Sequence, residues 1–508
     1  MFPLLYLLLA LPIILTLLFR PRNHKKANTT SSRYCLPPGP PCLPFIGNLL
    51  QIDGSIPHIS LRQLSRVYGP LMSLRLGRVR VLVASSARMA EEVLKTHDLA
   101  LCTRPPRAGQ QKLSYNGIDL AFSPFGVYWR AMRKTCIVHL FNSNRVQSLA
   151  PIRAQEVRKV MEKVSKSSFE SKPFNLSDAM ISLAGTIVCR MAFHKGSYEE
   201  VGEEGSRVQG LINETQAMFT SFFFSNHFPL LGFVDSLTGL NRRLDKTFQE
   251  LDRFCQETVD EYLNPNRVKH EHDDVLDVLV RTMNDGSSRF RLTVDHVKAI
   301  VMQNLFIAGT DTAAAALVWT MTYLMKNPTA MEKAQEEVRQ VVGRDKGFVD
   351  EQDVKQLPYL KAVVKETMRL QPPAPLLIRE SNEDCILGGY TIPPKTVVHV
   401  NVYAIGRDRE IWGDDSEEFR PERFMEKSVD DNKKGLDFDM VPFGGGRRMC
   451  PGMHMGLAIV HLTLANLLYG FDWGMPVGME RQDLDMEVIL GLTMHKKNAL
   501  CLMARKYV

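Results

Sequence analysis

Long apolar stretches with the spacing of helices dominate the hydrophobic pattern of this chain, and the alternation typical of strands is rare. Alternation appears in a few segments such as 71–85 and 391–405. The segment 294–326 is apolar almost all round and follows Thr293, a residue type that caps helices. As a helix it would be about 50 Å long, enough to cross a whole domain. The pattern predicts a mainly α protein with small β-sheets (α+β), built around one central helix.

The chain begins with another apolar stretch, residues 2–19, which contains no charged residue. As a helix it would measure about 27 Å, which matches the hydrocarbon layer of an endoplasmic-reticulum membrane. No small-residue cleavage site follows it. The basic residues that come next would stay on the cytosolic side; they are Arg20, Arg22, Lys25 and Lys26. We therefore expect a retained signal-anchor at 1–26, with a cleaved signal peptide as the alternative.

Prolines separate this anchor from the rest of the chain. The stretch LPPGPPCLPFIGN at 36–48 has four prolines around Gly39, and these residues cannot continue a helix and favour a stiff, extended connection. The sequence thus predicts three parts. They are an anchor with its basic flank at 1–26, a proline-rich hinge at 27–48 and a catalytic domain at 49–508.

Composition and charge exclude several classes of protein. Of the 508 residues, 44% are hydrophobic and 23% are charged, which excludes a disordered, collagen-like or disulfide-dense chain. The net charge of +7 comes without a block of like charges, which argues against nucleic acid as a partner. The nine cysteines form no C-x-x-C pair, so neither a zinc site nor a disulfide framework is indicated.

A polar interruption lies inside the central apolar segment, in the sequence AGTDT at 308–312. Gly309 costs about 1 kcal/mol relative to alanine inside a helix, and Asp311 and Thr312 are unusual in a buried position. Two interpretations stay open. Thr312 bonds to the carbonyl of the preceding turn while Asp311 pairs elsewhere, or the segment serves a reaction.

One cysteine stands out by its surroundings. Cys450 lies in PFGGGRRMCPG at 442–452, directly before the apolar stretch 453–471. The glycines allow a tight loop, and the backbone N–H groups at a helix start favour a thiolate over a thiol. A thiolate without a partner histidine or cysteine suits a soft metal ligand, and a buried structural cysteine is the alternative. The pattern of a phosphate-binding loop is absent.

Three charged residues indicate a buried ion-pair cluster. Glu366 and Arg369 lie three positions apart, hence on one face of a helix that ends before Pro372. Arg423 follows later, in EEFRPERF at 417–424. A surface ion pair would contribute little to stability, whereas one carboxylate held by two guanidiniums would form a buried clamp.

Five motifs, which together cover most of the chain, resemble those of a single family. WRAMR at 129–133 is similar to a W-x-x-x-R motif, AGTDT to an oxygen-activating segment, ETMR to an E-x-x-R pair, and PERF to the loop that completes a triad. The signature F-x-x-G-x-R-x-C-x-G is matched by Phe443, Gly446, Arg448, Cys450 and Gly452. These are motifs of the cytochrome P-450 superfamily of haem-thiolate monooxygenases. The residues in these motifs resemble those found in plant microsomal A-type members.

The resemblance implies a cytochrome P-450 fold that binds heme b, iron protoporphyrin IX. Cys450 would be the proximal iron ligand, in a loop shaped by Phe443, Gly446 and Gly452. Further roles would be propionate contacts by Trp129, Arg133 and Arg448, proton relay by Asp311 and Thr312, and a structural triad of Glu366, Arg369 and Arg423. Arg379 would be another propionate contact. However, PLLIRE at 375–380 is one residue shorter than the family pattern, and a one-residue slip would turn that side chain away.

The function implied by the resemblance is that of a membrane-anchored monooxygenase. It would oxidise a hydrophobic plant specialised metabolite with O2 and with electrons from NADPH-cytochrome P-450 reductase. Its catalytic domain would lie in the cytosol, at the endoplasmic-reticulum membrane. Two alternatives remain: a haem-thiolate isomerase or dehydratase that needs no O2, against which Asp311 and Thr312 argue, and a non-enzymatic haem binder.

Substrate identity is not specified by any motif. The resemblance implies a pocket formed by the segments 101–125, 207–240, 373–378 and 491–494. The second of these contains FTSFFFSNHF at 219–228. Its five phenylalanines could line the pocket, but we expect them to meet the membrane, because aromatic clusters near an anchor often lie at the interface.

Overall fold

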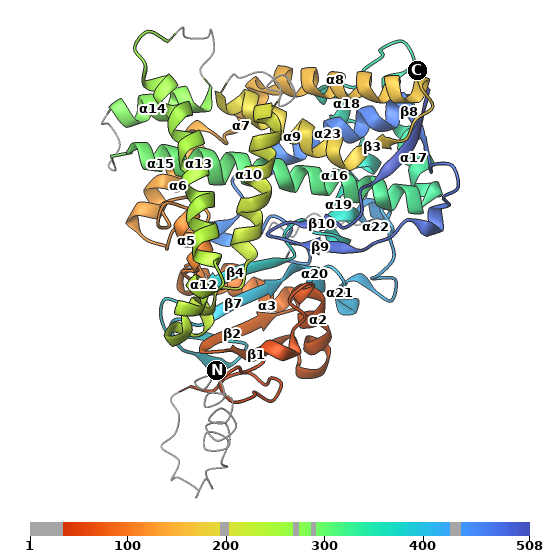
Figure 1. Ribbon diagram of the computed structural model, residues 1–508. Coiled ribbons are helices and arrows are strands. Elements are labelled where there is room, and N and C mark those ends of the chain that lie inside the picture. The colour runs from red at the N-terminus through yellow and green to blue at the C-terminus, as the bar shows by residue number, and fades with distance from the viewer. Residues whose placement is uncertain (1–33, 194–202, 268–273, 286–290, 427–437, 508) are drawn as a thin grey trace, which may run out of the picture.

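Figure 1 shows the computed structural model, which describes residues 34–193, 203–267, 274–285, 291–426 and 438–507. Helices make up most of the molecule, and a four-stranded sheet lies toward the end at which N is marked. The predicted class, mainly α with small sheets, is confirmed. The expected anchor at 1–26 and the first residues of the expected hinge lie outside the described residues.

The central helix extends over Val294–Lys326, as predicted. It is composed of α15 (Val294–Ala299), a wider π-helical segment (Ile300–Ile307) and α16 (Ala308–Lys326). The Thr293 side chain caps its first turn in a capping box. The pattern of apolar positions therefore located both ends of this helix, although it gave no sign of the π-helical segment.

Two other apolar helices pack against α16, namely α9 (Leu176–Phe193) and α23 (Met453–Gly470). All three are long and apolar enough to cross a membrane, yet most of their residues are buried inside the protein. Gly309 does not interrupt α16. A Cβ atom at this position would lie only 3.0 Å from Cγ2 of Val188 on α9, so the close contact of the two helices accounts for the glycine.

Further helices complete the body around this core (Figure 1). The longer ones are α6 (Val127–His139), α8 (Ala150–Phe169), α10 (Glu203–Thr220), α13 (Leu240–Leu263), α14 (Val275–Asp285), α17 (Pro328–Val342) and α19 (Pro358–Leu370). The helices α8, α17 and α19 contribute buried apolar residues to the same cluster as α9, α16 and α23. One continuous core therefore holds α16, α19 and α23 together, whereas α6 packs in a second hydrophobic cluster.

The main sheet joins segments that lie far apart in the sequence. Its strand order is β1 (Leu71–Leu76), β2 (Val79–Ala84), β7 (Val397–Asn401) and β4 (Leu376–Glu380). The pair of β2 and β7 is parallel, and the other pairs are antiparallel. The strand-like run predicted at 71–85 forms β-structure, but as two antiparallel strands, β1 and β2, and not as one.

The strand-like run predicted at 391–405 is not one strand. It contributes the end of β6 (Tyr390–Ile392), then β7, and then the short helix α20 (Val402–Ile405). Pro393 and Pro394 separate the two strands, because proline lacks the N–H group that a ladder requires.

A short hairpin near the C-terminus lies against the central helix. It is formed by β9 (Val488–Leu490) and β10 (Met494–Lys496). Trp319 on α16 donates its indole N–H to the carbonyl oxygen of Met494 (2.9 Å), and the Met494 N–H donates to the carbonyl of Pro373 (2.8 Å). These two hydrogen bonds fix the position of β10 relative to α16. Two further small sheets are present. One has three strands in the order β3 (Phe174–Asn175), β11 (Cys501–Lys506) and β8 (Phe471–Gly474), and the other pairs β5 (Cys385–Leu387) with β6.

The described part of the expected hinge lies against β1. The Ser73 N–H donates to the carbonyl of Pro38 (2.8 Å), and the Arg75 N–H donates to Oδ1 of the buried Asn48 (2.7 Å). The residues from Pro38 onward are therefore tied to the body, because their backbone supplies hydrogen-bond partners to a strand edge.

Candidate active site

The loop before α23 is shaped by its glycines and closes on Cys450. Gly446 has φ +64°, and a Cβ atom there would lie 2.1 Å from the carbonyl oxygen of Leu94, so no other residue fits without a shift of backbone. The Cys450 N–H donates to the carbonyl of Phe443 (2.9 Å), and Gly452 is the residue that precedes the first turn of α23. The predicted loop residues thus form one tight turn that holds the sulfur at a helix start.

The pKa of the Cys450 thiol corrects one sequence expectation. Desolvation by the surrounding protein atoms raises this pKa, although part of the side chain is exposed, and the Gly452 backbone N–H and the Arg133 charge lower it by less. The expected contribution of the helix start is present, but desolvation is larger, so the chain by itself favours the thiol. A thiolate at this position needs a further positive charge, which a coordinated metal ion supplies.

Two buried arginines, Arg448 and Arg379, and the partly buried Arg104 lie at or near this loop. Arg448 donates from Nε to the carbonyl of Cys102 (2.7 Å), and burial lowers its pKa to about 9. Arg379 donates from Nη2 to the carbonyl of Gly445 (3.4 Å), its Nε has no partner, and burial lowers its pKa to about 10. Arg104 donates from Nε to the carbonyl of Ala121 (3.0 Å), and burial lowers its pKa well below the usual value.

Arg379 therefore points into the site despite the shortened segment before it. It lies on β4 opposite Val398 of β7, and its side chain is buried. Arg104 was not singled out from the sequence. It belongs to no motif that separates it from other surface arginines, and only the fold brings it beside Arg379 and Arg448.

Two residues of α6 complete this group. Arg133 donates from Nη2 to the carbonyl of Met449 (2.6 Å), one residue before the cysteine. The Trp129 indole N–H donates to the carbonyl of Leu120 (3.0 Å), and its ring lies 4.4 Å from the guanidinium carbon of Arg448. The hydrogen bond expected from Trp129 to a propionate stays a prediction, while its ring contacts the arginines.

Positive charge exceeds negative charge at this site. Two buried carboxylates lie among these arginines. Asp119 interacts with Arg104 and Arg448, and burial raises its pKa to about 6. Asp98 interacts with Arg379 and pairs with Arg447 (2.8 Å). Buried charges require partners, and the orphaned Nε of Arg379 lacks one. A planar cofactor with two carboxylates and a metal ion that binds one thiolate would satisfy both the guanidiniums and Cys450. The residues present therefore fit a haem group.

Glu366 forms the predicted clamp on α19. Its Oε2 accepts from Arg369 Nε (2.7 Å) and its Oε1 accepts from Arg423 Nε (2.9 Å), and all three side chains are buried. Oε1 also accepts from the backbone N–H of Arg420 (2.8 Å). The two guanidiniums thus hold one fully buried carboxylate, as expected from the sequence.

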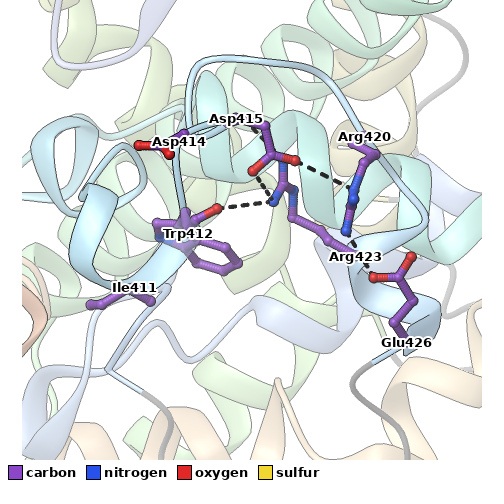
Figure 2. A pocket seen from close by; sticks show the side chains of 7 residues that line it. All are labelled: Ile411, Trp412, Asp414, Asp415, Arg420, Arg423 and Glu426. Carbon is purple, nitrogen blue, oxygen red and sulfur yellow. Dashed lines mark hydrogen bonds and ion pairs between the residues drawn. The ribbon is translucent and has the colours of Figure 1, made fainter.

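A polar pocket of about 450 Å³ lies on the outer side of this clamp. Figure 2 shows Arg423 donating to the Trp412 carbonyl and to Asp415, and Arg420 lying between Asp415 and Glu426. None of its lining residues belongs to the Cys450 loop or to the Asp311 segment. The pocket therefore marks the solvent-facing edge of the clamp and is separate from the candidate reaction site.

Asp311 and Thr312 lie in the first turns of α16 and both have partners. The Thr312 hydroxyl donates to the carbonyl of Ala308 (2.8 Å). Gln216 on α10 donates from Nε2 to Asp311 Oδ2 (2.8 Å), and Nε2 of His495 on β10 lies 2.7 Å from Asp311 Oδ1. The hydrogen bonds that the first interpretation of AGTDT requires, from Thr312 to the preceding turn and from Asp311 to partners elsewhere, are therefore present. This arrangement leaves the acceptor lone pairs of Thr312 available, so it does not exclude a role in a reaction.

Comparison with known proteins agrees with this arrangement. The family model of cytochrome P450 matches residues 37–503. The 6,7,8-trihydroxycoumarin synthase of Pastinaca sativa is 48% identical over 513 residues, which cover 99% of each chain, and the 5-OH-xanthotoxin synthase of Ammi majus is 47% identical over 93% of each. A solved structure of a zebrafish cytochrome P450 with abiraterone has a TM-score of 0.73 and 25% identity, and the match covers 89% of this chain and all of that one. The chain therefore belongs to the cytochrome P450 family of haem-thiolate monooxygenases.

Proposed function

We propose that this protein is a membrane-anchored monooxygenase that oxidises a hydrophobic plant specialised metabolite, with electrons from NADPH delivered by NADPH-cytochrome P-450 reductase. The observation that carries the proposal is the Cys450 loop with its excess of buried guanidiniums, which lies in the same core as the Asp311 and Thr312 pair. A haem-thiolate isomerase or dehydratase would have no use for a proton relay, which makes it the weaker candidate.

In this proposal each site residue has one task. Cys450 would bind the iron, and the thiolate ligand favours cleavage of the O–O bond when haem is bound. Arg448, Arg379, Arg104 and Arg133 would hold the propionates by charge-assisted hydrogen bonds, and Trp129 would support two of these guanidiniums through its ring. Glu366, Arg369 and Arg423 would keep the region behind the cysteine loop rigid.

Asp311 and Thr312 would move protons toward the reaction site. The Thr312 hydroxyl donates to the Ala308 carbonyl, and its free lone pairs could accept a hydrogen bond from a water molecule. Asp311, the residue directly before Thr312, could hold or release a proton at its carboxylate. A hydroxyl that orders a water in line with an acid is a common arrangement for proton delivery in an enclosed site.

Thr312→Ala should therefore separate electron use from product formation. Alanine preserves the helix and removes the hydroxyl together with one methyl group, so haem content and substrate affinity should change little. NADPH consumption should continue while peroxide rises and oxygenated product falls. The measurement is product formed per NADPH consumed, with Thr312→Ser as the control that retains the hydroxyl. An unchanged ratio with a substrate that has no hydroxyl or oxime of its own would remove Thr312 from the relay.

Coumarin-type phenolics are the first substrate class to test. Two relatives are named for forming a trihydroxycoumarin and a hydroxylated xanthotoxin, and the proposal extends this class to the present chain. The purified protein would be incubated with reductase, NADPH and a library of plant phenolics, terpenoids and alkaloids. A gain of one oxygen that requires NADPH would support a monooxygenase, whereas rearrangement without NADPH would support an isomerase or dehydratase.

Apolar side chains exposed near the N-terminal end support membrane contact at the endoplasmic reticulum. In the segment after α10, Leu230, Phe233 and Leu237 are 84%, 59% and 78% exposed. The phenylalanines of 219–228 mostly pack inward instead; Phe219 and Phe223 are buried and Phe222 is exposed. The membrane-facing surface of the described residues would therefore come mainly from residues 230–237. The proposed division of the chain is an anchor at 1–26, a hinge at 27–48 and a catalytic domain at 49–508.

Deletion of residues 1–26 should weaken membrane attachment without preventing haem incorporation, because the segment precedes the hinge and the whole described core. The measurements are the membrane-bound fraction after high-salt washing and the haem content per protein. The truncated protein with Leu230, Phe233 and Leu237 changed to serine should lose most of the remaining attachment. Truncated protein that contains no haem would contradict the proposed division of the chain.

A further inference from the structure

The carboxylate of Asp311 is held from two sides by elements that are distant in sequence. Gln216 on α10 donates to Oδ2 at 2.8 Å, and His495 on β10 lies 2.7 Å from Oδ1. Gln216 lies in the expected pocket segment 207–240 and His495 directly follows the segment 491–494, but neither residue belongs to one of the five motifs. The two partners differ in chemistry, because an amide cannot exchange its proton at neutral pH, whereas an imidazole can.

The imidazole of His495 lies between this carboxylate and solvent. Its side chain is 29% exposed, compared with 13% for the Asp311 side chain. The preceding residue, Met494, is fully buried and is hydrogen-bonded to Trp319 and to Pro373. Trp319 and Asp311 both belong to α16. This helix therefore binds the backbone of β10 through Trp319 and the imidazole of His495 through Asp311. The contact is therefore built into the fold.

The hydrogen-bond pattern determines which atoms could carry a proton. A carboxylate only accepts, so Nε2 of the imidazole is the donor in this pair, and Nδ1 is the ring nitrogen that does not face the carboxylate. The Thr312 hydroxyl is committed to Ala308, and Gln216 does not titrate. Among the side chains that the described structure shows hydrogen-bonded to Asp311, His495 is the one that can pass on a proton.

We propose that His495 supplies Asp311 with protons from solvent. The inference rests on the proposed function, because monooxygenation consumes two protons for each O2 that is reduced. In the proposed step, Nδ1 accepts a proton from a solvent hydronium ion while the Nε2 proton passes to Asp311 Oδ1. The ring then returns to its starting tautomer by releasing the Nδ1 proton to water and taking up a solvent proton at Nε2, so that each cycle moves one proton from solvent to Asp311. His495 acts through Asp311 and is a positioning and supplying residue, while Asp311 faces the reaction.

The test compares His495→Gln with His495→Leu in the full-length, haem-loaded protein with reductase. Glutamine retains an N–H donor for Asp311 but cannot relay a proton, and leucine removes both properties. We expect product per NADPH to fall by about threefold or more in both variants, with a matching rise in peroxide. If His495→Gln keeps the wild-type ratio, the imidazole only holds the carboxylate or has no role, and the proposal is overturned.

A spectroscopic measurement tests the contact independently of turnover. In the diamagnetic ferrous carbon monoxide form with 15N-labelled histidine, one signal should be absent in His495→Gln and should report a ring that carries a proton at Nε2. It should shift in Asp311→Asn; an unchanged signal would overturn the proposal. Wild-type protein that forms no oxygenated product with reductase would instead contradict the proposed function, whatever this signal shows.

Discussion

Replacing Glu366 with alanine is expected to leave almost no folded, haem-containing protein. The carboxylate is fully buried and accepts from Arg369, Arg423 and the backbone N–H of Arg420. Its removal leaves two buried guanidiniums without a counter-charge, which costs about 3–5 kcal/mol. That is a large share of the roughly 5–15 kcal/mol by which domains are stable. The measurement is haem content per expressed protein, together with the thermal unfolding midpoint of whatever accumulates.

Two control variants show how much smaller the effect on haem content and stability should be when a more exposed carboxylate is removed. Glu332→Ala removes an exposed carboxylate from the neighbouring helix α17 and should leave haem content unchanged. Asp415→Ala removes the outer partner of Arg423, a half-exposed carboxylate 3.3 Å from Nη2 at the pocket of Figure 2, and should cost about 1 kcal/mol or less. Glu366→Ala protein that loads haem at the wild-type level would show that the clamp does not stabilise the core.

Cys450→Ser should abolish the thiolate-type spectrum of the reduced carbon monoxide complex. Serine is nearly isosteric, so the turn made by the Phe443 carbonyl and Gly446 should persist. A hydroxyl stays protonated at neutral pH and is a poor ligand for iron, whereas a metal ion can convert the thiol of Cys450 into a thiolate. Monooxygenase activity should disappear together with the spectrum.

The matched control is Cys35→Ser, which changes an exposed cysteine outside the site and should have the wild-type spectrum. If the Cys450→Ser protein keeps a thiolate-type spectrum, another cysteine binds the iron. In that case the arrangement of guanidiniums around the 442–452 loop would need a different explanation.

Local sequence patterns predicted the parts of the site that are themselves local. The turn before α23, the central helix after Thr293 and the Glu366/Arg369 pair on one helix face each depend on neighbours within a few residues. Motif order then predicted that these parts belong together. The structure agrees, because α16, α19 and α23 share one hydrophobic core.

What the sequence did not predict depends on contacts between distant segments. His495 and Gln216 meet Asp311 only because β10 and α10 pack over α16, and no pattern along the chain marks either residue. The direction of the Cys450 pKa shift likewise depends on desolvation, which raises the pKa by more than the local backbone N–H group lowers it. Desolvation is a property of the packed core and cannot be deduced from a motif.

The parallel pairing of β2 with β7 limits how early this protein can fold during synthesis. About 310 residues separate the two strands, and at about 5–20 residues per second the ribosome needs roughly 15–60 s to produce the second one. During this interval the edge of β2, with the apolar Val81 and Val83, has no partner and can pair with another chain. Cys450 emerges later still. A cell that produces this protein must therefore shield an open sheet edge, for which a chaperone is suited, before any haem can be loaded.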